Sequence, residues 1–389
     1  MISPRHTGPR VRVLQIGKFY PPVRGGMETH LQDLCRSLAH SVDLDVIVGH
    51  DRVHTAHELD GEIRIHRIGT LATIASASIC PTMASAIRNT QADIVHLHSP
   101  NPTAVMSYLL SGHPGRLVVT HHSDIVRQRM LRLAYEPWLQ GLMHKAEAII
   151  SFSPNYIASS RVLARHRDKC HVIPHGIDPS RFADPESEKI DEIIGRFGPR
   201  IVLAVGRLVY YKGFEYLIRA VAGTNATLLI VGTGPLQSQL ENLASSLKIG
   251  ERVHFLGDVD DVMPYYHAAR IFALPSTARS EAFGIVQVEA MACGLPVINT
   301  QLETGVPFVS LDAVTGLTVP PCDVISLRQS IQRLLQDHSL HRQFSVAARE
   351  RVRTHFTLAN MAKHTLALYE EVLNARVIDS QPTLAAAHN

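Results

Sequence analysis

Short runs of Val, Ile and Leu alternate along this chain with longer amphipathic stretches, and no other feature of the sequence constrains the fold as strongly. The runs span residues 11–16, 44–48, 94–97, 117–120 and 148–151 in the first half, and 201–205, 227–231, 253–256, 271–274 and 296–298 in the second. Strands that alternate with helices predict parallel sheets wound from βα units, and therefore an α/β fold. Residues 62–68 instead alternate polar and apolar side chains, which predicts a half-exposed edge strand.

The chain divides into two halves of this kind. Its 389 residues are too many for one ordinary core, and the periodicity breaks at Pro174 and Gly176. We therefore predict two Rossmann-like domains, over residues 1–180 and 181–357, with a last helix at about 358–375 that packs back on the first domain. Parallel sheets bind ligands beyond the carboxyl ends of their strands, so the two domains are expected to face each other across a central cleft that holds the site.

The composition narrows the setting. Five scattered cysteines form no CxxC pair, and no stretch resembles a signal peptide or a membrane span, so we expect a cytoplasmic protein with reduced thiols. The first 180 residues hold 19 Lys and Arg against 14 Asp and Glu, whereas the remainder hold 19 against 21. This basic half could face a phosphate-bearing acceptor or an anionic membrane, and ordinary surface variation explains it equally well. No nucleic-acid partner is predicted.

Two motifs of the first half stand where sites of parallel sheets form. Gly25 and Gly26 lie between the first strand and a helix that starts near Met27, so their backbone N–H groups could approach a phosphate; a plain structural turn is the alternative. His121 and His122 follow directly on an apolar strand, and of the two we select His122 as the functional candidate.

Two motifs of the second half suit a diphosphate. Arg207 and Lys212 lie at a strand-to-helix junction, where two cations could grip phosphate oxygens, although solvated surface charges would look the same. Gly232 and Gly234 resemble the start of a dinucleotide fingerprint, but Gln237 stands in the place of its third glycine. Pro235 is expected at the first position of the next helix, so this segment predicts a tight turn beside a ligand.

Glu281 and Glu289 form the most specific pattern in the chain. We place Glu281 in the loop at a helix entrance and Glu289 about two turns inside that helix, roughly 12 Å away. This separation exceeds the ~5–5.5 Å of an acid–nucleophile pair. It suits two hydroxyl-rich groups of one ligand, a hexose and a ribose, because ionised carboxylates accept strong hydrogen bonds from hydroxyls.

With these motifs, the chain resembles glycosyltransferase family 4 from about Val11 to Tyr369, and that family has the GT-B fold. The resemblance implies a retaining transfer, with an acceptor-side first domain and a second domain that binds the nucleotide-sugar donor. Glu281 would hold the donor sugar and Glu289 the ribose. The other roles implied are diphosphate neutralisation by Arg207 and Lys212, donor contacts from the Gly25, Gly26, Gly232, Gly234, Phe283 and Gly284 backbone, and a place for His122 near the sugar.

A narrower likeness is to bacterial mannosyltransferases of exopolysaccharide and O-antigen assembly, which use GDP-mannose and polyprenyl-diphosphate-linked acceptors. It rests on residues 122–125, Tyr135 with Pro137, 304–308 and 315–320. The chain departs from the wider family at Gln287 and at Thr304. Since no Asp-x-Asp motif stands where this fold would need it, we expect no metal and no other cofactor, with front-face substitution at the anomeric carbon.

Several alternatives stay open at this point. They are a UDP-sugar-dependent transferase of the same family, a sugar-nucleotide epimerase or hydrolase, and an inactive sugar-nucleotide-binding protein. The stretch from Ile125 to Trp138 combines Arg127, Arg129 and Arg132 with apolar side chains. It could lie on an anionic inner membrane surface, or it could be a solvated helix face with Trp138 in the core.

Overall fold

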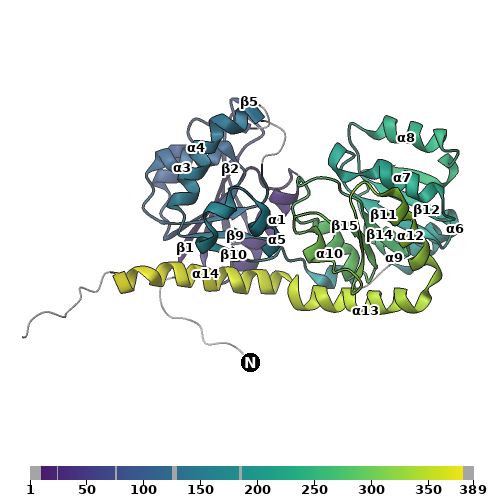
Figure 1. Cartoon of the computed structure of the whole chain (residues 1–389). Coiled ribbons are helices and arrows are strands. Elements are labelled where there is room, and N and C mark those ends of the chain that lie inside the picture. The colour runs from purple at the N-terminus through teal and green to yellow at the C-terminus, as the bar shows by residue number, and fades with distance from the viewer. Residues whose placement is uncertain (1–9, 24, 75–76, 125–128, 184–185, 380–389) are drawn as a thin grey trace, which may run out of the picture. The chain divides into compact units, whose positions relative to one another are not determined.

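The computed structural model describes residues 10–23, 25–74, 77–124, 129–183 and 186–379, with the side chains of 129–134 and 376–379 left aside (Figure 1). The chain forms two compact units. The first comprises Met1–Ser151, Arg161–Ile173 and Leu358–Asn389, and the second comprises Phe152–Ser160 and Pro174–Thr357. The boundary therefore follows Ile173, before the residue 180 that the sequence pattern indicates, and a short piece of the first half belongs to the second unit.

The first unit is built on an eight-stranded sheet in the order β10-β9-β8-β7-β1-β2-β4-β3. The bounds are β1 Arg12–Ile16, β2 Asp43–Gly49, β3 Ala56–Asp60, β4 Ile63–Ile68, β7 Ile94–Ser99, β8 Arg116–His121, β9 Ala148–Ser151 and β10 Cys170–Val172. All neighbours are parallel except β3 and β4. A separate antiparallel pair joins β5 (Ala72–Ile74) and β6 (Ala77–Ile79).

The prediction of an edge strand over residues 62–68 was wrong. These residues form β4, which pairs with β2 on one side and with β3 on the other. The chain reverses at Gly61, whose φ of 64° suits a tight turn. The exposed, polar β3 then takes the edge position, which protects the sheet from pairing with other chains.

Helices cover both faces of this sheet. They are α1 Gly26–Leu38, α2 Met83–Asn89, α3 Pro102–Ser111, α4 Arg129–Lys145 and α14 Leu358–Asp379, with short 3-10 turns η1 Leu163–Arg165 and η2 Arg167–Lys169. On one face α1 and α14 pack against each other and bury a core with strand residues such as Val13, Val46 and Val118. The helix α14 thus belongs to the first unit although it follows the whole second unit in sequence (Figure 1).

The second unit is a doubly wound, fully parallel sheet in the order β13-β12-β11-β14-β15-β16. Its strands are β11 Ile201–Val205, β12 Thr227–Val231, β13 Val253–Gly257, β14 Ile271–Leu274, β15 Val297–Thr300 and β16 Gly316–Val319. The strand order reverses between β11 and β14, so a crevice forms beyond the carboxyl ends of these two strands. This arrangement confirms the predicted α/β class.

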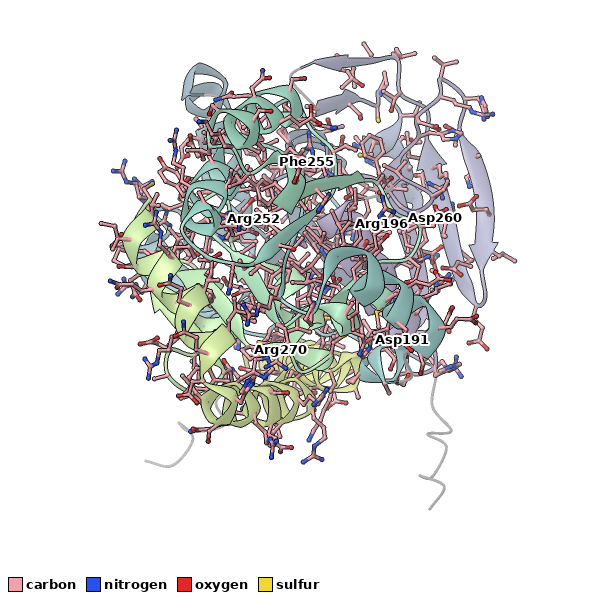
Figure 2. All side chains as sticks on the ribbon, turned by 90° about the vertical axis from the view of Figure 1, so that its right-hand side faces the viewer. Asp191, Arg196, Arg252, Phe255, Asp260 and Arg270 are labelled. Atoms are coloured by element: carbon pink, nitrogen blue, oxygen red, sulfur yellow. The ribbon has the colours of Figure 1, made fainter. Side chains whose placement is uncertain are left out.

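Two apolar layers enclose this second sheet. Its helices are α5 Pro154–Ser159, α6 Ser187–Phe197, α7 Phe214–Ala222, α8 Gln237–Ser246, α9 Met263–Ala268, α10 Ile285–Ala292, α11 Val306–Val309, α12 Val324–Gln336 and α13 His338–His355, with η3 Pro179–Phe182, η4 Tyr210–Lys212 and η5 Gly250–Arg252. Because α8 begins at Gln237, Pro235 lies in the turn before it and the expected first helical position was wrong. Arg252 (Figure 2) donates to the carbonyl oxygens of Val221, Thr224 and Ala226, and so closes the end of α7.

The segments by which the chain enters and leaves the second unit lie side by side. The N–H of Ile177 donates to the carbonyl oxygen of Phe356 over 2.8 Å, and Ile177 forms a parallel bridge with Thr357. This short pairing joins the two strands of chain within the second unit, a few residues from each crossing.

Candidate functional site

The loops that follow β11 and β14 meet at the crevice of the second unit. The N–H of Thr277, after β14, donates to the carbonyl oxygen of Tyr211, after β11, over 2.7 Å. Gly232 follows β12 with a φ of 125°, and a Cβ there would come within 2.3 Å of the carbonyl oxygen of Gly206. Three strand ends therefore approach one another backbone to backbone, and only glycine fits at Gly232.

Lys212 and Glu281 form an ion pair across this crevice. The Lys212 Nζ lies 2.6 Å from Glu281 Oε2, and the Ser276 hydroxyl donates to the same oxygen over 3.1 Å. Only about a tenth of either charged side chain is exposed, at 10% and 11%. A cation and a carboxylate that the sequence places 69 positions apart are thus brought into one partly buried group. A ligand that uses either charge must compete with this pair.

Arg207 lies differently. It follows β11 in the same loop as Lys212, but its residue is exposed. An exposed guanidinium can bind an incoming anion without first breaking a buried ion pair. The two predicted phosphate cations are therefore unequal: one is engaged by Glu281 and the other faces solvent.

Glu289 is half-buried on α10, where its Oε2 accepts a hydrogen bond of 2.8 Å from the Tyr266 hydroxyl. Burial, and then the charge of Glu289, hold the pKa of Tyr266 well above its usual value. Tyr266 therefore stays protonated and orients the carboxylate. Because α10 begins at Ile285, Glu289 lies just over one turn inside the helix, not the two turns expected. No feature of the sequence pointed to Tyr266.

The entrance of α10 is held rigidly. Gly284 has a φ of 74°, and a Cβ there would meet Leu274 at 2.6 Å. Phe283 is buried and its ring packs against Phe152 and His175. The buried Gln287 donates to the Phe283 carbonyl oxygen and accepts from Asn299. The departure from the family at Gln287 thus serves to fix the loop that carries the proposed donor-binding backbone.

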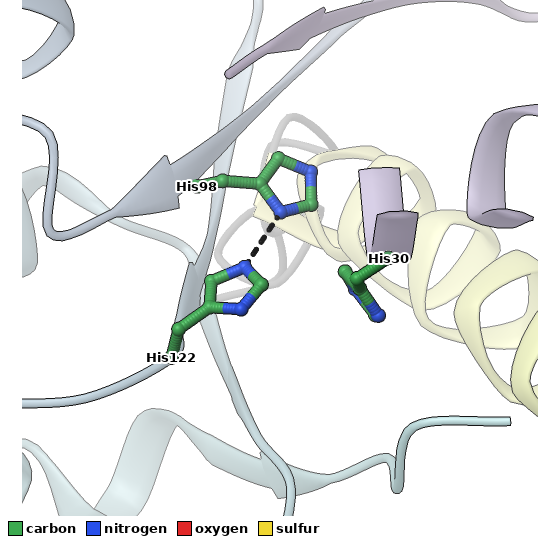
Figure 3. A group of neighbouring side chains, drawn as sticks. All are labelled: His30, His98 and His122. Carbon is green, nitrogen blue, oxygen red and sulfur yellow. Dashed lines mark hydrogen bonds between the residues drawn. The ribbon is translucent and has the colours of Figure 1, made fainter. Parts of the chain in front are cut away.

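In the first unit, His121 and His122 separate into different environments. The buried His121 ring contacts Asp124 through Nε2 and Oδ1 at 3.0 Å. The His122 Nε2 instead lies 3.0 Å from the Nδ1 of His98, and its ring centre is 5.0 Å from that of His30 (Figure 3). His98 and His30 were missed, although two histidines at alternate positions of the apolar strand over 94–99 were a visible signal.

These three histidines are the group of the described residues that could hold a metal. Their candidate ligand atoms, one from each of His30, His98 and His122, all lie within 4.8 Å of one another, and all three residues are buried. Neutral imidazoles bind Zn²⁺. The contact between His98 and His122 is a hydrogen bond, however, so a proton lies between two of the three rings, and a metal that used these nitrogens would have to displace it.

The Gly25–Gly26 segment carries a feature that was not anticipated. Gly25 caps α1, and a Cβ there would come within 2.3 Å of the carboxylate of Glu28. Glu28 is buried, and desolvation raises its pKa. A phosphate that approaches this helix end meets the backbone N–H groups together with this carboxylate. Gly26 has open space around it.

The stretch proposed to contact a membrane lies largely outside the description. Ile125 and Arg127 belong to undescribed residues, and the side chains of Arg129 and Arg132 are not described. Trp138 is 36% exposed on α4, so its expected place in the core was wrong, whereas Tyr135 is buried. Among the helices that the structure describes, none combines the length and the apolar character needed to cross a bilayer.

Two family profiles match the chain, one in each half. Residues 24–181 match "Glycosyltransferase Family 4", and residues 186–351 match "Glycosyl transferases group 1". The chain is 33% identical to the D-rhamnosyltransferase WbpZ of Pseudomonas aeruginosa, over 89% of this chain and 92% of that protein. It is 30% identical to the O-antigen chain mannosyltransferase C of Escherichia coli, over 94% of this chain and 100% of that protein.

Solved structures share the architecture. The sucrose-phosphate synthase of Thermosynechococcus elongatus superimposes with a TM-score of 0.79 at 24% identity, covering 94% of this chain and all of that one. Anabaena HepE in complex with UDP superimposes with a TM-score of 0.76 at 20% identity, covering 93% and 100%. Both likenesses establish a common two-sheet arrangement of the fold.

Proposed function

The chain belongs to glycosyltransferase family 4 and has the GT-B fold, and on this premise we propose that it transfers a hexose with retention, namely mannose from GDP-mannose, onto a lipid-linked or saccharide acceptor in surface polysaccharide assembly. The observation that carries the proposal is the Lys212–Glu281 pair at the strand-order switch of the second unit. A cation for the leaving diphosphate and a carboxylate for the sugar there meet at one point.

The choice of mannose rests on relatives. One is named an O-antigen chain mannosyltransferase, and another, 28% identical over 94% of this chain, is a GDP-mannose-dependent mannosyltransferase of Mycolicibacterium smegmatis that acts on a phosphatidylinositol monomannoside. The D-rhamnosyltransferase shows that a different hexose is used within the same range of identity. A comparison of donors therefore tests the choice of mannose directly.

In the proposed reaction the acceptor oxygen attacks the anomeric carbon from the face that the diphosphate leaves. The bond from that carbon to the phosphate oxygen breaks, the new glycosidic bond forms, and the acceptor's proton passes to the departing phosphate. Arg207 and Lys212 would stabilise the charge of the leaving group, Glu281 and His122 would orient the sugar, and Glu289 would hold the ribose. The protein's contribution is positioning and electrostatic stabilisation.

We expect GDP-mannose to raise the melting temperature and UDP-glucose, at the same concentration, to leave it unchanged. A ligand at 100 times its Kd stabilises a protein by about 2.7 kcal/mol, which thermal denaturation detects easily. Stabilisation by a UDP-sugar alone would favour the UDP-dependent alternative. Release of GDP without an acceptor would favour a hydrolase, an isomerised sugar nucleotide an epimerase, and binding without turnover an inactive binding protein. The anomeric configuration of the product, read by NMR, tests retention.

We expect EDTA to leave the transfer rate unchanged, because in the proposed mechanism Arg207 and Lys212 neutralise the diphosphate in place of a metal. The rate should be measured with EDTA, with Mg²⁺ and with Mn²⁺. A strict requirement for either ion would overturn the metal-free mechanism. Zn²⁺ should be assayed separately, since the histidine group of the first unit could bind it and inhibit.

The first unit is also proposed to dock reversibly on anionic membranes through Arg127, Arg129 and Arg132. The protein should cosediment with vesicles that contain anionic lipid at low salt and should dissociate as salt screens the charges. Replacing the three arginines with glutamine should weaken binding, whereas neutral vesicles should bind little at any salt concentration. Failure to bind anionic vesicles at low salt would remove the membrane from the proposal.

A further inference from the structure

A network of hydrogen-bonded polar side chains runs through the apolar core of the first unit, beneath α14. Its members are at most 2% exposed: Gln15, His96, His98, Thr120 and Tyr369. They come from β1, β7, β8 and α14, and the paired positions Gln15 with His96 and His98 with Thr120 bring them side by side. Buried polar groups are costly unless they are hydrogen-bonded, so a run of five in one core calls for a reason.

Every contact in this network is a hydrogen bond of ordinary length. Starting from the site, His122 Nε2 lies 3.0 Å from His98 Nδ1, and His98 Nε2 lies 3.0 Å from Gln15 Oε1. Gln15 Nε2 then lies 3.0 Å from the Tyr369 hydroxyl. That hydroxyl lies 2.7 Å from His96 Nδ1, and His96 Nε2 lies 2.7 Å from the Thr120 hydroxyl.

The Gln15 amide sets the direction of the two bonds that it makes and, through His98, of the bond to His122. Its Oε1 can only accept, so His98 Nε2 carries a proton and donates to it; its Nε2 can only donate, so Tyr369 accepts. His98 is 1% exposed and hydrogen-bonds to Gln15 and His122, neither of which is an anion, so a charged ring would be buried without a counter-ion. The ring is therefore neutral, and its Nδ1 is an acceptor. His122 must therefore donate from Nε2. At the other end, Tyr369 donates to His96, which donates to Thr120.

We propose that Gln15, His98 and Tyr369 are positioning residues for His122, which hold its ring in one orientation with the proton on Nε2. The inference rests on the proposed function, in which His122 lies near the donor sugar. Because Nε2 of His122 is engaged with His98, the orientation of the ring is set by hydrogen bonds within the first unit. The network thus presents His122 to a ligand in one orientation.

The tautomer can be read without any substrate. In a two-bond ¹H–¹⁵N spectrum of the full-length protein, we expect His122 to carry its proton on Nε2. Gln15→Met removes both amide contacts at similar volume, so His98 loses its acceptor and the His122 signal should shift toward a mixture of tautomers. Tyr108→Phe is the control, because it deletes the hydroxyl of another buried tyrosine of this unit that does not belong to the network. A wild-type His122 protonated on Nδ1, or an unchanged signal in Gln15→Met, would overturn the proposal.

The kinetic test compares two replacements of His98. A glutamine at this position can accept from His122 and donate to Gln15 through one amide, whereas leucine can do neither. Partners that orient a metal-ligating histidine are worth about 10-fold to 100-fold, and we expect His98→Leu to lower kcat in this range with KM little changed. His98→Gln should recover most of the loss. Equal activity of both variants and the wild type would show that the network has only a structural role, even if the NMR result holds.

The two tests fail separately. The NMR readout does not depend on which donor the enzyme uses, so a wrong donor assignment leaves it intact. Tyr369→Phe adds an intermediate case, because it removes one hydroxyl from α14 and leaves Gln15 without its acceptor while His98 keeps its own. It should weaken the preference of His122 less than Gln15→Met does. An effect of Tyr369→Phe larger than that of Gln15→Met would contradict the donor and acceptor roles assigned to this network.

Discussion

Replacing Glu281 with glutamine is expected to lower the rate of sugar transfer about 100-fold, the scale typical for loss of one charged or hydrogen-bonding group that acts in the transition state. The amide keeps the shape of the side chain but loses the negative charge that makes its hydrogen bonds to sugar hydroxyls strong. It also releases Lys212 from its ion pair, which measures 2.6 Å in the native protein. Initial rates at saturating donor give the effect on kcat, and their concentration dependence gives the effect on KM.

Glu303→Gln provides the matched control. Glu303 belongs to the same unit, but its side chain is 84% exposed and its ion pair with Arg279 is long, at 3.5 Å. Exposed pairs of this kind contribute little to stability, so this variant should transfer sugar like the wild type. Near-normal transfer by Glu281→Gln, with the control also normal, would remove Glu281 from the reaction.

Lys212→Met is the second change for which we expect a large effect, and here both activity and stability should fall. The variant removes a cation from the proposed diphosphate site and leaves the carboxylate of Glu281 largely buried without its partner. Breaking a buried ion pair by removing one member costs roughly 3 kcal/mol or more. Thermal and denaturant unfolding should therefore show a clear loss of stability, alongside a loss of transfer similar to that of Glu281→Gln.

The double variant Lys212→Met with Glu281→Gln separates the two effects. With no unpaired charge left, much of the stability should return, because contacting residues are not additive. Transfer should stay as low as in the worse of the two single variants. A double variant as unstable as Lys212→Met would show that the cost does not come from the orphaned carboxylate.

Arg207→Met should differ from Lys212→Met in its effect on stability. Since Arg207 is exposed, its loss should weaken transfer without a measurable change in unfolding. Arg342→Met, another exposed arginine of the second unit, on α13, controls for the loss of one surface charge. Equal transfer by the two arginine variants would argue that Lys212 alone serves the diphosphate.

The strands could be predicted from the sequence because each is a short apolar run, and Ala148–Ser151, Ile201–Val205, Thr227–Val231 and Ile271–Leu274 match to the residue. Their order in the sheets could not. The edge strand β3 has the sequence Ala-His-Glu-Leu-Asp and its three middle residues are exposed, so no apolar run marks it. The sequence pattern therefore assigned the edge position to its neighbour β4. Order is decided by pairing across distant segments, which no local pattern records.

The same division holds for the site. Residues that follow apolar strands, such as His122 and Lys212, could be selected because sheet ends are where loops converge. Their partners could not be selected. The contact of Lys212 with Glu281 depends on β11 lying beside β14, and that of Glu289 with Tyr266 depends on how α9 and α10 pack. A buried partner is recognised from three-dimensional contact, since tyrosine and glutamine also occur as plain surface residues.

The placement of α14 has a consequence for how the protein is made. On the ribosome, the first unit lacks its covering helix until the whole second unit has been synthesised, which takes roughly 10–40 s at ordinary rates of elongation. During that interval the second unit can close its core, while the apolar face around Val13, Val46 and Val118 stays without α14. The unit whose synthesis begins first is therefore the last to fold completely. Its nascent form exposes an apolar surface that a chaperone could bind until Tyr369 is synthesised and contacts Gln15, 354 positions earlier in the chain.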